Sequence, residues 1–286
     1  MSITKFFLDS CDPSETKIAI ETLGHLDGQT TNPTLLVKNP FVQARLNGGK
    51  MPEKELLELY KKAIVEISNL IPNGSVSIEV YADWNSTKED LLAQANEFYT
   101  WIPNAHIKFP TITAGIEAAE EFVNNGGRVN MTLVFSQEQA LAVHKATINM
   151  KNSGDVLLSP FLGRLDDIDQ NGMDLINNIR KMYSELDSNV SLLAASTRTL
   201  DHILGCLTPF ENKECDIITA PLGLWQNYET NKAKLTGFVY PENTLKPILY
   251  EVLDCSKSWK EMNIEHELTS KGLDRFVADW NGVIVR

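Results

Sequence analysis

Short β-rich runs alternate with longer helix-like segments along most of this chain of 286 residues. The predicted strands are Lys5–Ser10, Gly28–Asn32, Ser75–Ala82, His106–Pro110, Arg128–Phe135, Val156–Gly163, Ser191–Thr197 and Cys215–Pro221. The clearest helices between them are predicted at Glu53–Leu70, Lys88–Trp101, Ile116–Asn124, Gln137–Asn149, Gly172–Leu186 and Leu200–Leu207. This alternation is typical of a parallel sheet covered by helices. Eight such units in about 220 residues match a TIM barrel in number and size.

The rival architecture for this pattern is an open, doubly wound sheet, whose dinucleotide-binding forms carry Gly-x-Gly-x-x-Gly after the first strand. That motif is absent here. We therefore expect an α/β protein with the (β/α)8 TIM-barrel fold, built as a single domain. The barrel is expected at about residues 4–239 and a C-terminal helical extension at about 240–286, with helices at Thr244–Leu253 and Ser270–Trp280.

Composition excludes several classes of function. The formal net charge is −12, whereas nucleic-acid binding requires a basic surface. No apolar run approaches the roughly 20 residues that span a bilayer, so we expect no membrane partner. The cysteines Cys11, Cys206, Cys215 and Cys255 form no Cys-x-x-Cys pair, and the histidines show no ligand spacing. These features predict free thiols in a reducing cytoplasm and no metal site.

Lys108 points most directly to a chemical function. It lies in the predicted strand His106–Pro110, where Ile107 and Phe109 share one face and Lys108 takes the other. Burying a lone ammonium is costly unless it is paired or neutral. A neutral, desolvated lysine can attack a ketone and form a Schiff base. Taken alone, such a lysine is more often a surface residue on an edge strand.

Other predicted strands also place polar residues on the inner face or at their C-terminal ends, where TIM-barrel active sites are built. Simpler explanations exist for some of them, since Asn32 could be a turn residue, Asp9 a helix cap and Thr132 an ordinary β-former. Glu79 is harder to explain in this way, because a carboxylate among valines and isoleucine needs a partner or a function. The polar set is Asp9, Asn32, Ser77, Glu79, Tyr81, Asn130, Thr132, Ser196 and Arg198.

Five motifs follow one another at the spacing of successive barrel units. They are Thr30–Thr34 (TTNPT), Ile107–Thr111 (IKFPT), Val129–Leu133 (VNMTL), Ser159–Asp166 (SPFLGRLD) and Ala194–Arg198 (AASTR). In this order they resemble the transaldolase family, from Asp9 to about Pro221. The segment Lys271–Trp280 also looks similar to the family's C-terminal motif.

The resemblance implies roles for individual residues. Lys108 would be the Schiff-base lysine, Asp9 and Glu79 the acid/base pair, and Thr132 the residue that holds a catalytic water. Substrate would be bound by Asn32, Thr31, Asn130, Ser159 and Phe161, and its phosphate by Arg164, Ser196 and Arg198. Thr197 and Thr199 depart from the usual residues on either side of the arginine, so the phosphate site is expected to differ in detail. No cofactor or metal is implied.

The nearby Glu79 would hold a proton on Lys108 if the two paired directly. We therefore expect that Glu79 does not simply form an ion pair with Lys108 and instead acts through a water held by Thr132. Asp9 would take the proton of the C4 hydroxyl as the C3–C4 bond breaks. The two arginines would provide the local positive charge that an acidic protein needs to bind an anionic substrate.

By this resemblance the chain would be a transaldolase of the pentose phosphate pathway. It would move a dihydroxyacetone unit from sedoheptulose 7-phosphate or fructose 6-phosphate to glyceraldehyde 3-phosphate or erythrose 4-phosphate. A related aldolase that releases free dihydroxyacetone is an alternative. Phe161 favours transfer, because aldolase-type members have a tyrosine there. A third interpretation is a catalytically inactive barrel that binds sugar phosphates. A metal-dependent aldolase is disfavoured, because the sequence has no clustered histidines. Assembly into a homo-oligomer stays open.

Overall fold

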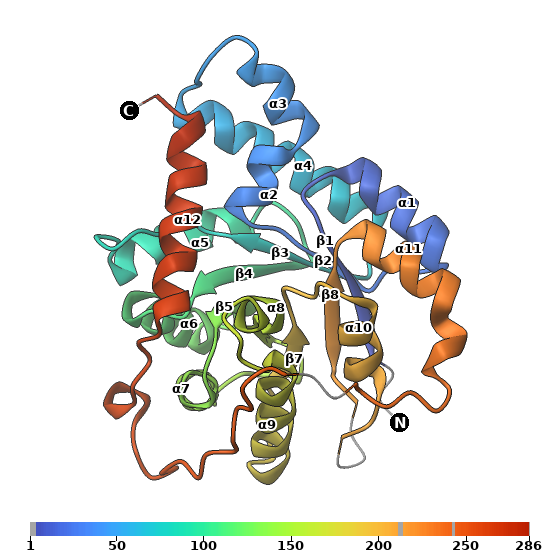
Figure 1. Cartoon of the computed structure of the whole chain (residues 1–286). Helices are drawn as coiled ribbons and strands as arrows, with labels where there is room; N and C mark the ends of the chain where they lie inside the picture. Colours follow the sequence, from blue (N-terminus) through green and yellow to red (C-terminus); the bar gives the residue numbers. More distant parts are fainter. Residues whose placement is uncertain (1–3, 211–213, 242–243, 286) are drawn as a thin grey trace.

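Eight parallel strands close into a barrel in the order in which they follow one another in the sequence (Figure 1). The computed structural model describes residues 4–210, 214–241 and 244–285. All eight predicted strands are confirmed, and several end one to three residues earlier than expected. The strands are β1 Lys5–Asp9, β2 Gly28–Thr30, β3 Ser75–Glu79, β4 Ala105–Pro110, β5 Val129–Val134, β6 Val156–Pro160, β7 Ser191–Ala194 and β8 Ile217–Ala220.

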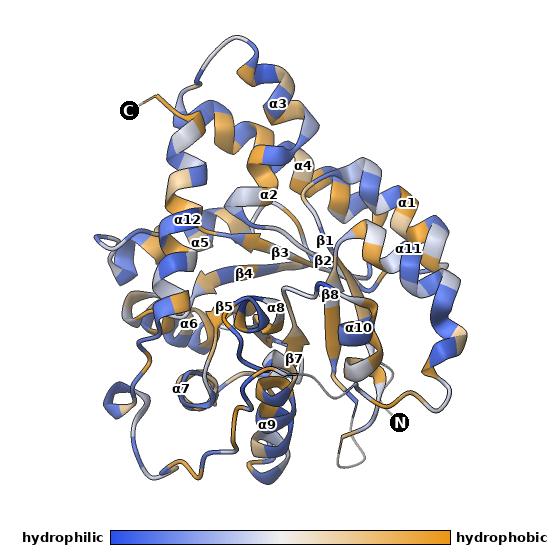
Figure 2. Cartoon of the chain, viewed as in Figure 1, coloured by the Kyte–Doolittle hydropathy of each residue, from blue (hydrophilic) through white to orange (hydrophobic). Residues whose placement is uncertain are grey.

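The helices form a layer outside the barrel, and Figure 2 shows largely hydrophobic strands surrounded by helices that carry both hydrophobic and hydrophilic residues. In α4 the buried residues Leu56, Tyr60, Ala63, Ile64 and Ile67 recur every three or four positions, which places them on the face toward the barrel. The helices are α1 Pro13–Leu23, α2 Pro33–Lys38, α3 Pro40–Leu46, α4 Glu53–Leu70, α5 Lys88–Tyr99, α6 Thr113–Asn124, α7 Gln137–Ala146, α8 Leu162–Asp166, α9 Gly172–Glu185, α10 Leu200–Leu207, α11 Leu222–Asn231 and α12 Glu267–Val283. Two short 3-10 helices cover Lys232–Leu235 and Trp259–Glu261.

Side-chain caps fix where several helices begin after the strands. Asp12 caps α1, so Asp9 at the end of β1 is not the cap of this helix. Asn32 caps α2 by accepting a hydrogen bond from the Leu35 N–H at 2.9 Å. Thr199 caps α10 in the same way. Helix-forming signals therefore explain part of the polar sequence at the strand ends, including Asn32.

The pairing of the central strands places polar residues side by side inside the barrel. Glu79 on β3 is level with Lys108 on β4, and Lys108 is level with Asn130 on β5. The pairing of β5 with β6 shifts between Met131 and Val134. At this bulge Leu133 has a φ of 60°, a left-handed conformation that non-glycine residues rarely adopt. Bulges of this kind re-aim side chains next to active sites.

The region after β8 differs from the prediction. The expected helix at Thr244–Leu253 is wrong, because this segment is extended and runs past α9 and α7 (Figure 1). Pro247 disfavours a helix there, and side chains of the neighbouring helices bind the backbone instead. The Ile248 N–H donates to Asp174, and the Ile248 carbonyl accepts from Asn178 at 2.8 Å. The second predicted helix is confirmed within α12.

Helix α12 lies beside α2 and reaches over the C-terminal ends of the central strands (Figure 1). Its inner residues Leu273 and Phe276 line a small cavity together with Glu79. The Trp280 indole N–H donates to Glu53 at 3.2 Å, which ties α12 to α4. No helix among the described residues has both the length and the apolar character needed to cross a membrane.

Candidate active site

A cavity of about 220 Å³ opens at the C-terminal ends of the strands, the face on which TIM barrels carry their active sites. Eight of the residues predicted for the site line this cavity: Asp9, Asn32, Lys108, Ser159, Phe161, Arg164, Ser196 and Arg198. Glu79, Thr132, Thr31 and Asn130 are not among its lining residues. Glu79 and Thr132 nevertheless lie on β3 and β5, the two strands that flank β4 with Lys108. Thr31 and Asn130 take part through hydrogen bonds that the sequence did not indicate.

Lys108 and Glu79 form a buried pair, with Lys108 Nζ 2.9 Å from Glu79 Oε2 and side-chain exposures of 4% and 3%. The expectation that they do not pair directly is therefore wrong. Both project inward from neighbouring strands at the same level and are almost fully buried, so separating them would leave two buried charges without a partner. Lys108 Nζ also donates to the Thr31 carbonyl at 3.1 Å. Burial raises the pKa of Glu79, although the charge of Lys108 acts in the opposite direction.

Asp9 lies at the end of β1 on the wall of the cavity. The Thr30 hydroxyl donates to Asp9 Oδ1 at 2.7 Å and lies 2.7 Å from the hydroxyl of Thr219. Burial raises the pKa of Asp9, and the nearby charge of Lys108 and the Thr30 hydrogen bond oppose this shift. A carboxylate with a raised pKa is a stronger base once it is ionised, which suits proton abstraction.

Thr132 is fully buried on β5, next to the bulge at Leu133. Its hydroxyl has no hydrogen-bonding partner among the residues that the structure describes. Its backbone carbonyl accepts from both the N–H and the hydroxyl of Thr111. A buried hydroxyl without a protein partner is costly, so this position favours a bound water or substrate group as its partner.

Asn130 and Ser159 are joined to each other inside the barrel. The Ser159 hydroxyl donates to Asn130 Oδ1 at 2.7 Å, and Asn130 Nδ2 donates to the Ser77 hydroxyl at 3.0 Å. The Thr31 hydroxyl is turned away from the cavity, toward Tyr60 and the Ser77 carbonyl. Thr31 can therefore act on the site through the carbonyl that accepts from Lys108, and its side chain does not line the cavity.

Arg164 and Arg198 enter the cavity from different segments. The Arg164 guanidinium on α8 lies 5.0 Å from the ring centre of Phe161 and 5.7 Å from that of Phe276, contacts that hold it by cation–π attraction. Arg198 follows β7 and donates two hydrogen bonds to Asp167, at 3.3 and 2.8 Å. Ser196 lines the same cavity two residues before Arg198 and has a φ of 57°. Two guanidinium groups at one end of a cavity can bind a phosphate.

The two departures from the family pattern have structural roles. The Thr197 hydroxyl donates to the Thr219 carbonyl at 2.8 Å, which joins the end of β7 to β8. The Thr199 hydroxyl accepts from the His202 N–H at 3.2 Å as the cap of α10. Both side chains are thus occupied in holding the loop that carries Arg198.

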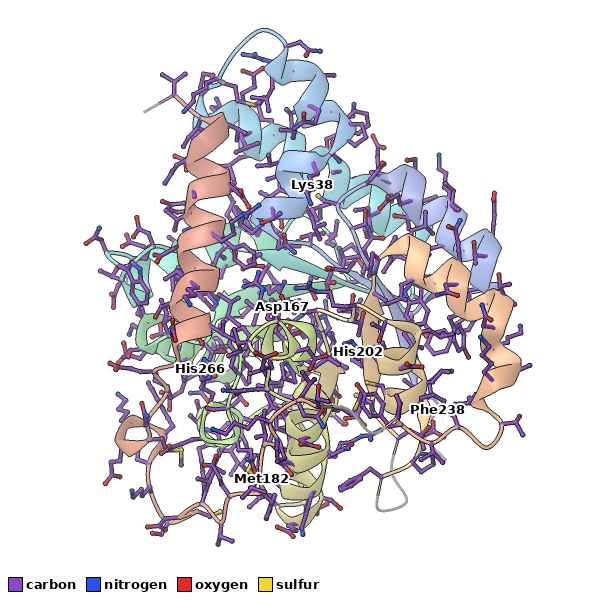
Figure 3. All side chains as sticks on the ribbon, in the orientation of Figure 1. Lys38, Asp167, Met182, His202, Phe238 and His266 are labelled. Carbon is purple, nitrogen blue, oxygen red and sulfur yellow. The ribbon has the colours of Figure 1, made fainter. Side chains whose placement is uncertain are left out.

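Several lining residues were missed by sequence reasoning. Lys38, in the last turn of α2, is labelled in Figure 3, and Phe276 reaches the cavity from α12. The signal for Phe276 was present, since it lies in the segment Lys271–Trp280 that resembles the family. Lys38 follows the TTNPT motif by four residues, but nothing in the sequence shows that a short helix turns it toward the site. Among the described residues, no group of three or more His, Cys, Asp or Glu side chains could hold a metal ion.

Residues 6–285 match the family model described as Transaldolase/Fructose-6-phosphate aldolase. A protein of Cereibacter sphaeroides named "Probable transaldolase" is 34% identical over 276 residues, covering 96% of this chain and 95% of its own. One of Brucella ovis with the same name is 33% identical, with 96% of each chain covered. A crystal structure of a candidate orotidine-monophosphate decarboxylase from Toxoplasma gondii is similar in fold, with a TM-score of 0.50, 10% identity and coverage of 80% and 91%.

Proposed function

The chain belongs to the transaldolase/fructose-6-phosphate aldolase family, and from this premise we propose that it is a transaldolase that uses Lys108 as its Schiff-base residue. The reaction moves a dihydroxyacetone unit from fructose 6-phosphate or sedoheptulose 7-phosphate to erythrose 4-phosphate or glyceraldehyde 3-phosphate. The observation that carries the proposal is the buried contact between Lys108 and Glu79 beside a cavity with arginines at its wall.

The first step requires a neutral amine on Lys108. The pair of Lys108 and Glu79 can hold one proton on either side chain without a change in net charge. Burial raises the pKa of Glu79, which reduces the free-energy cost of moving the proton from the ammonium to the carboxylate so that the amine can attack C2 of the ketose. The attack gives a carbinolamine. Glu79 then gives the proton to the carbinolamine hydroxyl, which leaves as water and so forms the iminium. The Thr132 hydroxyl, which has no partner among the described residues, would hold the water that leaves.

Cleavage of the C3–C4 bond follows on the iminium that links C2 to Lys108. Asp9 accepts the proton of the C4 hydroxyl, the C4–O bond becomes the aldehyde of the departing aldose phosphate, and the bonding electrons of C3–C4 move to form an enamine. The raised pKa of Asp9 makes its carboxylate a better base for this step. The enamine then attacks the acceptor aldehyde, Asp9 returns the proton, and hydrolysis frees Lys108.

Phosphate binding is assigned to the cationic wall of the cavity. Arg164 contacts the rings of Phe161 and Phe276, and Arg198 with Ser196 approaches from the segment after β7. These cations give a local attraction for a phosphate in a protein whose formal net charge is −12. The side chains of Asn32 and Ser159, also in the lining, would contact the sugar hydroxyls.

The alternative within the family is an aldolase that releases free dihydroxyacetone. Phe161 lines the cavity and presents no hydroxyl that could activate water for hydrolysis of the enamine or iminium, which favours transfer. A Phe161→Tyr variant should therefore release more dihydroxyacetone per transfer event. The reading as an inactive binding barrel is disfavoured because a sugar-phosphate binder has no need for a buried lysine–carboxylate pair.

The decisive test is borohydride reduction in the presence of fructose 6-phosphate, followed by intact mass and peptide mapping. We expect a reduced three-carbon adduct on Lys108, and loss of the adduct when erythrose 4-phosphate is added before the borohydride. Lys108→Met should give no adduct. Lys88→Met is a matched control, because Lys88 pairs with Glu121 at the surface, outside the cavity. An adduct that forms but persists with the acceptor present would favour the aldolase, and no adduct on any lysine would refute the Schiff-base mechanism.

We propose that the reaction belongs to the pentose phosphate pathway. We also propose that the protein lies in the cytoplasm, and the free thiols of Cys11, Cys206, Cys215 and Cys255 support this location. We propose that the chain forms a single domain that includes the C-terminal segment, because α12 packs on α2 and over the cavity. We also propose that the chain can assemble into a homo-oligomer, and light scattering would measure its mass in solution.

A further inference from the structure

His202 lies where the two segments that bring arginines to the cavity meet. One segment is α8 with Arg164, and the other is the loop after β7 with Arg198. The His202 side chain is 3% exposed and does not line the cavity. We propose that His202, together with Asp166, is a positioning residue that fixes the backbone of Arg198 and thereby the geometry of the phosphate site. The identity of the ligand as a sugar phosphate rests on the function proposed above.

The hydrogen bonds of His202 define its tautomer. The Arg198 backbone N–H donates to His202 Nδ1 at 3.2 Å, so Nδ1 is an acceptor. His202 Nε2 lies 2.8 Å from Asp166 Oδ2 and therefore carries the proton that it donates to this carboxylate. Asp166 Oδ1 accepts from the Gly172 N–H at 2.9 Å. The imidazole thus links the loop of Arg198 to the end of α8 through both of its nitrogens.

The two linked segments have little freedom to shift against each other. The Gly163 N–H on α8 donates to the Ser196 carbonyl at 3.1 Å. A Cβ at Gly163 would lie 2.2 Å from that oxygen and 2.4 Å from Cγ of Arg198. Ser196 itself has a φ of 57°, a left-handed conformation that non-glycine residues rarely adopt without support. The loop therefore needs support from neighbouring residues. His202 gives such support, because its buried Nδ1 accepts from the backbone N–H of Arg198, two residues after Ser196.

This arrangement matters for phosphate binding because the guanidinium of Arg198 must reach one anion together with that of Arg164. In the structure Arg198 pairs with Asp167, which directly follows Asp166 in the chain. Asp167 and His202 are both labelled in Figure 3. Its side chain is about half exposed and can turn, so the position of its backbone decides whether it meets the phosphate. Holding binding groups within a fraction of an ångström is what gives a preorganised site its affinity.

The simpler explanation is that His202 only fills space in the buried face of α10. The two explanations differ in what a substitution changes. A space-filling histidine would affect stability and would alter all substrates alike. Loss of a positioning histidine would weaken the binding of phosphate and of phosphorylated substrates. A substituted side chain whose amide oxygen accepts from the Arg198 N–H would restore that binding.

The test compares His202→Ala, His202→Asn and His202→Gln with the intact protein. The asparagine amide oxygen can occupy the place of Nδ1, whereas the glutamine amide reaches the place of Nε2. For His202→Ala we expect about a tenfold rise in KM for fructose 6-phosphate and in the dissociation constant for inorganic phosphate, with kcat changed less than twofold. The kcat/KM for unphosphorylated fructose should stay within twofold. His202→Asn should recover most of the loss, and His202→Gln less.

His144→Ala is the matched control, since His144 is also a buried histidine, bonds Ser188 at 2.8 Å, and does not line the cavity. Equal losses for fructose and fructose 6-phosphate, or an asparagine variant no better than glutamine, would overturn the proposal. If His202→Ala does not fold, the comparison of Asn with Gln decides the matter. If the intact protein forms no adduct and shows no turnover, the transaldolase proposal fails, and the phosphate dissociation constants alone then support or overturn the role of His202.

Discussion

Replacing Lys108 by methionine tests the chemistry and the electrostatics of the site together. Methionine is similar in length but carries no amine, so no Schiff base can form and turnover should be abolished. The substitution also leaves Glu79 without the cation that lies 2.9 Å from it in the interior of the barrel. The fold should persist, because the surrounding strands are closed by backbone pairing on both sides of β4.

The size of the stability loss should depend on pH. Removing one partner of a buried pair costs about 3–5 kcal/mol if the remaining group stays charged. Glu79 can avoid that cost by taking up a proton, since burial raises its pKa and the opposing effect of Lys108 is gone. Below its unfolded-state pKa of roughly 4.3, the carboxyl is protonated in both states and there is no penalty. As the pH rises above that value, the variant should lose about 1.4 kcal/mol per pH unit until the pH reaches the pKa in the folded state.

The measurement is urea unfolding at pH 5 and pH 8 for the intact protein, for Lys108→Met and for Lys108→Met combined with Glu79→Gln. The single variant should lose more stability between the two pH values than the intact protein does, and the double variant should not show this additional loss. A single variant whose stability follows the intact protein at both pH values would refute the account of Glu79 as a buried carboxyl that depends on Lys108. Retained turnover would refute the role of Lys108 itself.

Four further predictions concern the rest of the site. Arg164→Ala should raise KM for phosphorylated substrates by about tenfold or more and leave unphosphorylated ones little changed, and equal effects on both would remove its phosphate role. Gly163→Ala should cost about 1–3 kcal/mol in stability by unfolding assay and should also weaken phosphate binding, because its Cβ would lie 2.2 Å from the Ser196 carbonyl. Thr132→Val should lower kcat by about 10²-fold with no loss in melting temperature, since the hydroxyl has no partner among the described residues; unchanged kcat would argue against a bound water there. Because burial raises the pKa of Asp9, kcat/KM should fall on the acid side as the pH drops through a value above 3.8, and a flat profile down to about pH 4 would contradict its role as the base.

Much of the barrel could be predicted from the sequence because its signals are local. Alternating strands and helices identify a parallel sheet, and the spacing of apolar residues identifies the buried face of α4. The two-residue period of a strand also places Lys108 on the face opposite to Ile107 and Phe109 without any knowledge of the fold. The failed helix at Thr244–Leu253 shows the limit of this reasoning, because the backbone there is bound by side chains of distant helices.

The sequence by itself thus determined the strands, their inward-facing polar residues and the order of the motifs. The tertiary structure decided which of those residues touch. Strand register brought Glu79 level with Lys108, so that two buried charges pair directly instead of through water. The meeting of α8 with the loop after β7 joined Asp166, His202 and Arg198 across more than thirty positions of the chain. Such contacts depend on side-chain direction and on how separate segments pack, and neither is encoded in a local pattern.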